Sequence, residues 1–181
     1  ESIAAEFDVP GQVVTVLSIE TGNVNDTYRV IKRTTYSEVQ FVLQRISQAV
    51  FQKPDLVMAN MKAITDYGHK RLEEQVTKAN RIWQLPKVLA TLDGEDYFID
   101  AEGGYWRALS MIASATSHER VMNVEHAREA GYVLGHFQRI ISDFPIDQLE
   151  DTLPGFHITP LYLKYHDKVV ETDSAQQKLA A

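Results

Sequence analysis

The chain has 181 residues, of which 44% are hydrophobic and 24% are charged, so it is long enough to bury a core in one domain or slightly more. Its 18 Lys and Arg residues against 25 Asp and Glu residues give a formal net charge of -7, which makes a nucleic-acid partner unfavourable. The sequence has no cysteine, which excludes disulfides and cysteine nucleophiles, and no apolar run of bilayer-spanning length, so we expect a cytoplasmic protein without membrane association.

The first part of the chain predicts a run of strands. Apolar and β-branched residues gather between short polar turns at residues 12–19, 27–32 and 38–46. Consecutive short strands joined by turns form an antiparallel meander.

A long helix is predicted over residues 54–76, because Pro54 suits a first helical turn and apolar residues recur at helical spacing from Val57 to Leu72. The pattern then predicts three further strands, at residues 85–91, 97–100 and 105–112. The sheet is therefore expected to have five or six strands.

The composition changes after residue 112. Residues 113–117 are small and polar, as in a connector, and the sequence beyond them has helical periodicity. Asn123 is expected to cap a helix that ends near residue 143, and a last helix is expected after Thr159-Pro160. The fold class is therefore α+β, in two unequal parts of residues 1–112 and 113–181.

The turn between the first two strands is a candidate binding site. Gly22, Asn23, Asn25 and Thr27 offer backbone amides, amide side chains and a hydroxyl, which are groups that bind phosphate. The spacing fits neither a P-loop nor the glycine-rich loop of protein kinases, and Gly-Asn turns also close ordinary hairpins. From the residues alone, both interpretations stay open.

Arg45 is the second candidate. Strand alternation puts it on the same side as Val39, Phe41 and Leu43, which is expected to be a covered side. A guanidinium at the end of an apolar face needs an anion, because burying it unpaired costs several kcal/mol. That anion is either a ligand or a carboxylate, such as Asp55 or a glutamate of the following helix.

The other polar residues predict no further site. The six histidines form no HExxH or comparable pair, and the carboxylates of residues 93–100 surround a turn as in a solvated hairpin. Packing in the core is expected for Trp83, Trp106, Leu134, Phe137 and Ile141.

Segments spread over nearly the whole chain carry a resemblance to one enzyme family. They include Gly22-Asn23-Val24-Asn25-Asp26-Thr27-Tyr28, Phe41-Val42-Leu43-Gln44-Arg45-Ile46, Tyr105-Trp106-Arg107, Leu134-Gly135-His136-Phe137 and Leu153-Pro154-Gly155-Phe156-His157-Ile158-Thr159. Together they are similar to the amino-terminal region of N-acetylhexosamine 1-kinases. Those enzymes belong to the aminoglycoside phosphotransferase and choline kinase group.

This resemblance implies a protein-kinase-like fold, with an antiparallel-sheet N-terminal lobe, one main helix and the first helices of a truncated helical C-terminal lobe. The first hairpin would then cover the ATP phosphates, and Arg45 would neutralise phosphate charge. Leu43 would lie against the adenine. The hinge residues that bind the adenine edge would be Met111, Ile112 and Ala113. Ala59 stands where the family pattern leads us to expect an acidic residue, so the carboxylate partner of Arg45 stays open.

The resemblance also implies an ATP- and Mg²⁺-dependent phosphotransferase acting on a sugar or amino-sugar hydroxyl. That reaction needs an H-x-D-x-x-x-x-N loop and a later aspartate for magnesium, and neither occurs in these residues; His166-Asp167 lacks the spacing. We therefore expect the N-terminal part of a longer kinase, inactive alone, with its metal ligands outside this chain. The alternative is a non-catalytic half-kinase that binds a partner.

An incomplete second lobe has one further consequence. Apolar residues around Leu134, Phe137 and Leu161 would lack the surface that normally covers them. Exposed apolar patches tend to associate, so we expect self-association.

Overall fold

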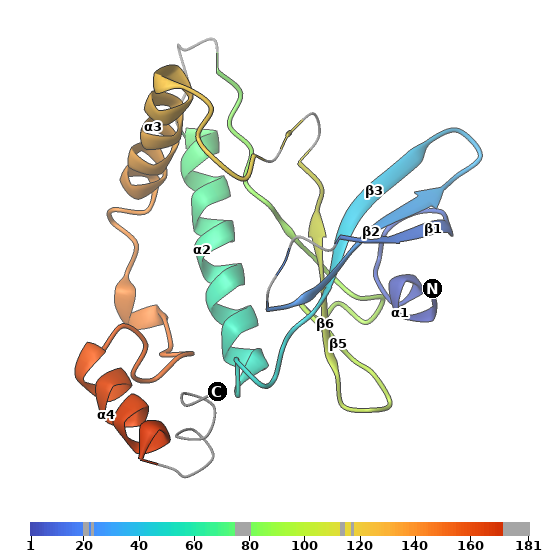
Figure 1. Cartoon of the computed structure of the whole chain (residues 1–181). Coiled ribbons are helices and arrows are strands. Elements are labelled where there is room, and N and C mark those ends of the chain that lie inside the picture. The colour runs from blue at the N-terminus through green and yellow to red at the C-terminus, as the bar shows by residue number, and fades with distance from the viewer. Residues whose placement is uncertain (20–21, 23, 75–80, 113–114, 117, 172–181) are drawn as a thin grey trace.

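The computed structural model describes residues 1–19, 22, 24–74, 81–112, 115–116 and 118–171. Within these residues an antiparallel six-stranded sheet has the order β1-β2-β3-β6-β4, with β5 paired to β6 (Figure 1). The strands are β1 (Gln12–Ser18), β2 (Asp26–Arg33), β3 (Glu38–Arg45), β4 (Val88–Leu89), β5 (Phe98–Ile99) and β6 (Tyr105–Ser110). The helical elements are α1 (Ser2–Ala5), α2 (Pro54–Glu74), α3 (Val124–Ile140), the 3-10 helix η1 (Ile146–Gln148) and α4 (Thr159–Val170). The α+β class and the antiparallel meander are confirmed.

The strand predicted at residues 85–91 is the largest departure in the sheet. Only Val88 and Leu89 pair with β6, at Leu109 and Ala108. The chain then turns toward the N-terminal segment, where the Asp8 amide donates to the Ala90 carbonyl at 2.9 Å. The Ala90 carbonyl and the Leu92 amide therefore bond to residues 8 and 6, and the Thr91 amide bonds to the Glu95 carbonyl, so that none of these three groups bonds to β6.

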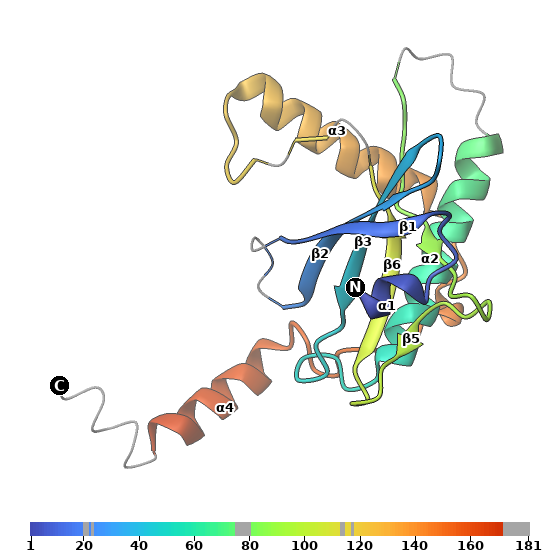
Figure 2. The same cartoon turned by 90° about the vertical axis from the view of Figure 1, so that its right-hand side faces the viewer.

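The N-terminal segment covers one face of the sheet, which we call the α1 face. The short helix α1, which the sequence analysis did not predict, leads into Phe7 and Val9 and lies against the sheet (Figure 2). The buried cluster on this face consists of Ala4, Phe7, Val9, Val30, Phe41, Leu43 and Ala108. Lys32 is also buried here, and its Nζ donates to the carbonyls of Phe7 and Val9 at 3.0 Å each. This face is closed, and its buried cation is hydrogen-bonded.

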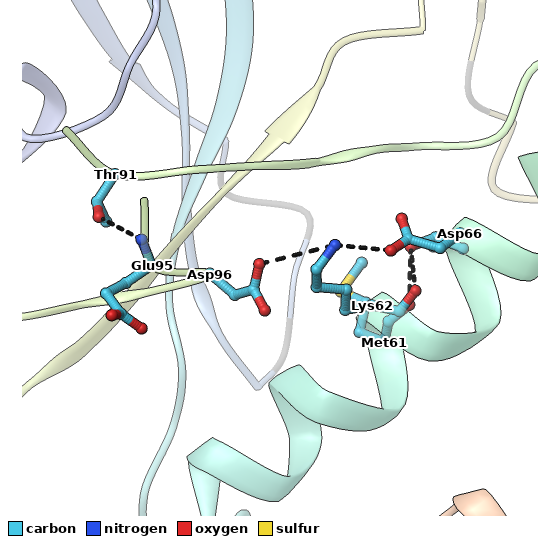
Figure 3. Close-up of polar contacts among 7 residues, drawn as sticks. Met61, Lys62, Asp66, Thr91, Glu95 and Asp96 are labelled. Carbon is cyan, nitrogen blue, oxygen red and sulfur yellow. Dashed lines mark hydrogen bonds and ion pairs between the residues drawn. The ribbon is translucent and has the colours of Figure 1, made fainter. Parts of the chain in front are cut away.

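Helix α2 covers part of the opposite face, which we call the α2 face. Ile46, Met58, Val88 and Leu109 form the buried cluster there. Figure 1 shows α2 running alongside β6, between the sheet and α3. Lys62 of α2 contacts Asp66 on its own helix at 2.6 Å and Asp96 of the β4–β5 connection at 4.0 Å (Figure 3). The apolar cluster and this ion pair fix α2 against the β4–β5–β6 half of the sheet.

Helix α3 begins where the sequence predicts, because the Asn123 side chain accepts the His126 amide at 2.8 Å as an N-cap. Its packed side differs from the prediction. Ile140 is buried and His136 stacks on Trp83 with ring centroids 3.9 Å apart, whereas Leu134 is 59% exposed. The expected core position of Leu134 is therefore wrong, because α3 packs through the side that meets Trp83.

The described parts of the C-terminal segment expose much apolar surface. Leu134 and Leu161 are 59% and 51% exposed, whereas Phe137, the third residue of the apolar patch expected in the sequence analysis, is half-buried. Self-association stays a prediction. None of the helices in the described ranges combines the length and apolar character of a membrane span.

Candidate functional site

The two faces of β3 decide where a site can form. Alternation places Leu43 and Arg45 on the α1 face, and Val42 and Gln44 on the α2 face. The α2 face is covered only in part, because Val42 and Gln44 remain half-buried while Leu43 is 3% exposed. The open part of the sheet is therefore the α2 face of β1, β2 and β3.

A row of three polar side chains, which we call the polar row, runs from this open part to the edge of α2: Thr27 and Gln44 lie on the open strands, and Arg107 lies on β6 beside Met61 of α2. Thr27 lies opposite Gln44 in the β2–β3 register, and Gln44 lies opposite Arg107 in the β3–β6 register. Gln44 Nε2 donates to Thr27 Oγ1 at 3.0 Å, and Arg107 Nε donates to Gln44 Oε1 at 3.0 Å. Direct cross-strand neighbours are thus joined into one hydrogen-bonded unit.

The β1–β2 turn is tied to the same end of the sheet. Asn25 Oδ1 accepts the Ser47 amide at 3.0 Å, and the Asn25 carbonyl accepts the Thr27 hydroxyl at 3.3 Å. A Cβ added at Gly22 would lie 3.8 Å from Thr27 Oγ1, so Gly22 is adjacent to the polar row. Three of the predicted turn residues, Gly22, Asn25 and Thr27, therefore come together; Asn23 lies outside the described residues.

Arg107 is the cation of the polar row, and it has no carboxylate partner among the described residues. Its Nη1 donates to the thioether sulfur of Met61 at 3.2 Å. Burial lowers the pKa of Arg107, because desolvation disfavours the charged form. Thioether sulfur and amide oxygen are neutral acceptors, so they orient this positive charge without neutralising it.

The predicted roles of Arg45 and Leu43 need correction. Leu43 is enclosed by the α1-face cluster and has no free surface for an adenine ring. Arg45 also lies on that side, with its Cζ 5.9 Å from the centre of the Trp106 ring and Asp26 opposite it in the β2–β3 register. The two residues are on the other face of the sheet from the polar row.

An acidic group accompanies Arg45, but it is neither Asp55 nor a helix glutamate. Asp100 accepts the Trp106 Nε1 hydrogen at 2.7 Å and the Gly104 amide at 2.7 Å. The bond from Trp106, the backbone amides and the nearby Arg45 charge together lower the pKa of Asp100. Arg45 therefore lies in an acidic, structural environment, which favours the structural alternative for this residue.

The predicted hinge follows β6. Met111 and Ile112 are 37% and 36% exposed, and their backbone groups make no hydrogen bond with the described residues. They line a cavity of about 220 Å³ together with His69, Trp83, Gln84, Leu85 and Ser110. Backbone donors and acceptors that the described residues leave unbonded, beside a cavity, are what binding an adenine edge requires; Ala113 lies outside the described residues.

A larger cavity of about 410 Å³ lies between the β3–α2 connection and the segment before α4. Its lining combines aromatic rings, a carboxylate, an amide and a hydroxyl from Phe156, Tyr162, Asp151, Gln52 and Thr152, among others. Two residues near this cavity have a left-handed backbone: Gly155 in its lining, with φ 83°, and His157 next to Phe156, with φ 63°. The His157 amide donates to Tyr162 Oη at 3.1 Å, which holds this segment to α4.

Over the described ranges of the chain, no three His, Asp or Glu side chains gather in a way that could hold a metal ion. The donors present, an uncompensated guanidinium with amide and hydroxyl groups, suit a phosphate chain and not a bare divalent cation. A scan against models of protein families gives no match for this chain.

Sequence reasoning missed Gln44 and Arg107. Each carried a usable signal, because Gln44 is a polar residue within the apolar run of β3 and Arg107 follows two aromatic residues in β6. Both signals needed the register between β3 and β6 before they could be combined.

Proposed function

We propose that these residues form the nucleotide-binding part of an ATP- and Mg²⁺-dependent small-molecule kinase, with a sugar or amino sugar as the acceptor. One observation carries the proposal: a single long helix, inserted between β3 and β4, covers half of one face of a β1-β2-β3-β6-β4 antiparallel sheet. At the border between the covered and the open half, Arg107 has no carboxylate partner among the described residues. The resemblance to N-acetylhexosamine 1-kinases implies this same arrangement of sheet, helix and connector.

The nucleotide would lie along the α2 face. Its adenine would meet the backbone groups of Met111 and Ile112, which make no hydrogen bond with the described residues, and Val42 would contact the ring in place of Leu43. The phosphate chain would extend toward Gln44 and the β1–β2 turn, at the opposite end of β3. Magnesium would enter with the nucleotide and withdraw charge from its phosphates.

The cavity of about 410 Å³ is the proposed acceptor site, and its volume lies in the range of small-ligand pockets. Phe156 and Tyr162 offer apolar ring surface, and Asp151, Thr152 and Gln52 offer hydroxyl-binding groups. This mixture suits a polyhydroxylated ligand. Saturation-transfer NMR with N-acetylhexosamines is expected to detect binding that Phe156→Ala weakens, while Phe51→Leu, outside this cavity, leaves it unchanged.

Nucleotide binding is tested by titrating the chain with Mg-ATP and with adenosine in a calorimeter. Both are expected to bind, and Arg45→Gln is expected to leave both affinities unchanged. Folded protein that binds neither ligand would overturn the proposal. No H-x-D-x-x-x-x-N motif occurs in these 181 residues, so they are expected to bind ATP without hydrolysing it.

A further inference from the structure

We infer that Arg107 of β6 is the phosphate-binding cation of this protein, so that the positive charge comes from the strand next to β3 and not from β3 itself. The ligand class is a di- or triphosphate chain. The inference deepens the proposed function and rests on it only for the adenosine part of the ligand.

The charge environment of Arg107 is the first argument. Arg33, Arg71, Arg81 and Arg128 each contact a carboxylate, with nitrogen–oxygen distances between 2.5 and 3.6 Å. Arg107 is half-buried and contacts no carboxylate within the described residues, in a chain with a formal net charge of -7, and desolvation lowers its pKa. A desolvated cation is costly unless an anion joins it, so the missing anion is expected to be a ligand.

The rigidity of the side chain is the second argument. Gln44 holds Nε and Met61 holds Nη1, while Nη2 has no hydrogen-bond partner among the described residues. Gln44 is itself fixed by Thr27, which the Asn25 carbonyl orients. A guanidinium held at two nitrogens loses little conformational entropy when the third binds a phosphate oxygen.

The choice of neutral partners is the third argument. A glutamate at position 44 or 61 would close an internal ion pair and remove the reason for an external anion. The residues present orient the cation and leave its charge available. Arg29, on the same face of β2 and also without a carboxylate partner in the described ranges, adds positive potential beside the polar row.

The test uses inorganic tripolyphosphate, Mg-ATP and adenosine as probes in calorimetric titrations of the wild type and three variants. Arg107→Met removes the charge and keeps the volume. Gln44→Glu supplies an internal carboxylate. Arg45→Gln is the matched control, since it removes a neighbouring arginine charge from the other face of the sheet.

Tripolyphosphate and Mg-ATP are expected to bind at least about tenfold more weakly to Arg107→Met and to Gln44→Glu, with adenosine affinity unchanged. Arg45→Gln is expected to match the wild type for all three probes. Melting curves separate this role from a structural one, because Arg107→Met is expected to melt no lower than the wild type, as it removes a desolvated charge.

The remaining outcomes separate the two proposals. Unchanged tripolyphosphate and ATP binding in both variants, or a fall in melting temperature without loss of binding, would overturn the role of Arg107 and leave the kinase proposal standing. Arg107-dependent tripolyphosphate binding, with no adenosine binding and no preference for ATP, would support the anion site and overturn the nucleotide. Absence of binding by every probe would overturn both.

Discussion

The two faces of the sheet differ in the groups that contact their cationic side chains. On the α1 face, Lys32 donates to two carbonyls and Arg45 lies beside the carboxylate of Asp100. On the α2 face, Arg107 is held by an amide oxygen and a thioether, with no carboxylate among the described residues. The first face is complete by itself. The second is arranged to receive an anion.

Adjacent residues of β3 serve these two faces. Leu43 fills the core under α1, and Gln44 orients the cation on the α2 face. Neighbouring residues of β3 therefore point to opposite faces, and one has a structural role while the next has a role in binding. The comparison predicts that α1-face substitutions change stability with little effect on ligand binding.

Phe41→Ala is expected to cause the largest loss of stability. Phe41 is fully buried in the α1-face cluster, so its truncation is expected to cost about 3–5 kcal/mol of the free energy of unfolding. Urea denaturation measures this loss. Val14→Ala, at a position 40% exposed on β1, is the control and is expected to cost less than about 0.5 kcal/mol. A small loss for Phe41→Ala would mean that α1 does not close this face.

Lys32→Met is expected to cause the second-largest loss in the free energy of unfolding. The substitution leaves the buried carbonyls of Phe7 and Val9 without their donor, at about 1–3 kcal/mol for each unsatisfied group. Part of that cost is offset because the desolvated ammonium is removed. We expect a net loss of about 2 kcal/mol by urea denaturation, and none for Lys70→Met on the exposed side of α2. Equal stability of the two variants would contradict a structural role for Lys32.

The sequence predicted the helices and strands better than the contacts between them. The meander, α2 and the Asn123 cap follow from local signals: turn residues, helical spacing and a capping side chain. The strand predicted over residues 85–91 shrank to Val88–Leu89, because the chain beyond Leu89 pairs with residues 6–8, which are distant in the sequence, and with the following turn.

The site was predicted in part for a similar reason. Asn25 and Thr27 lie where the turn placed them, and both contact neighbours in the sheet. Both faces of β3 carry apolar residues, Phe41 and Leu43 on one side and Val42 on the other. Alternation alone therefore could not assign a helix to either face. Alternation predicts Arg45 at the end of the Phe41–Leu43 face, whereas the contact of Gln44 with Arg107 depends on the register between β3 and β6.

Gly104→Ala is expected to cause an intermediate loss of stability. An added Cβ would lie 2.6 Å from Asp100 Oδ2 and 2.8 Å from Arg45 Nε, and Asp100 is locked by its bonds to Trp106 and the turn. We expect a loss of about 1–2 kcal/mol, typical of overpacking, with unchanged tripolyphosphate affinity. The control is Gly131→Ala in α3, where a Cβ meets no atom within 4 Å and a gain of up to about 1 kcal/mol is expected. Weaker tripolyphosphate binding by the Gly104 variant would connect the Arg45 environment to the site.

Lys62→Met is expected to have the smallest effect, because the ion pairs of Lys62 with Asp66 and Asp96 are partly exposed and such pairs contribute about 0.2–1 kcal/mol (Figure 3). The hydrogen bond to Asp66 raises the pKa of Lys62 above its ordinary value of 10.5. A raised pKa means that the stabilisation is fully present below 10.5 and is lost as pH rises through the pKa of the folded state. The melting temperatures of variant and wild type should therefore differ at pH 8 and converge in strong alkali. A constant difference at all pH values would show that the methylene stem of Lys62, and not its charge, fastens α2 beneath the polar row.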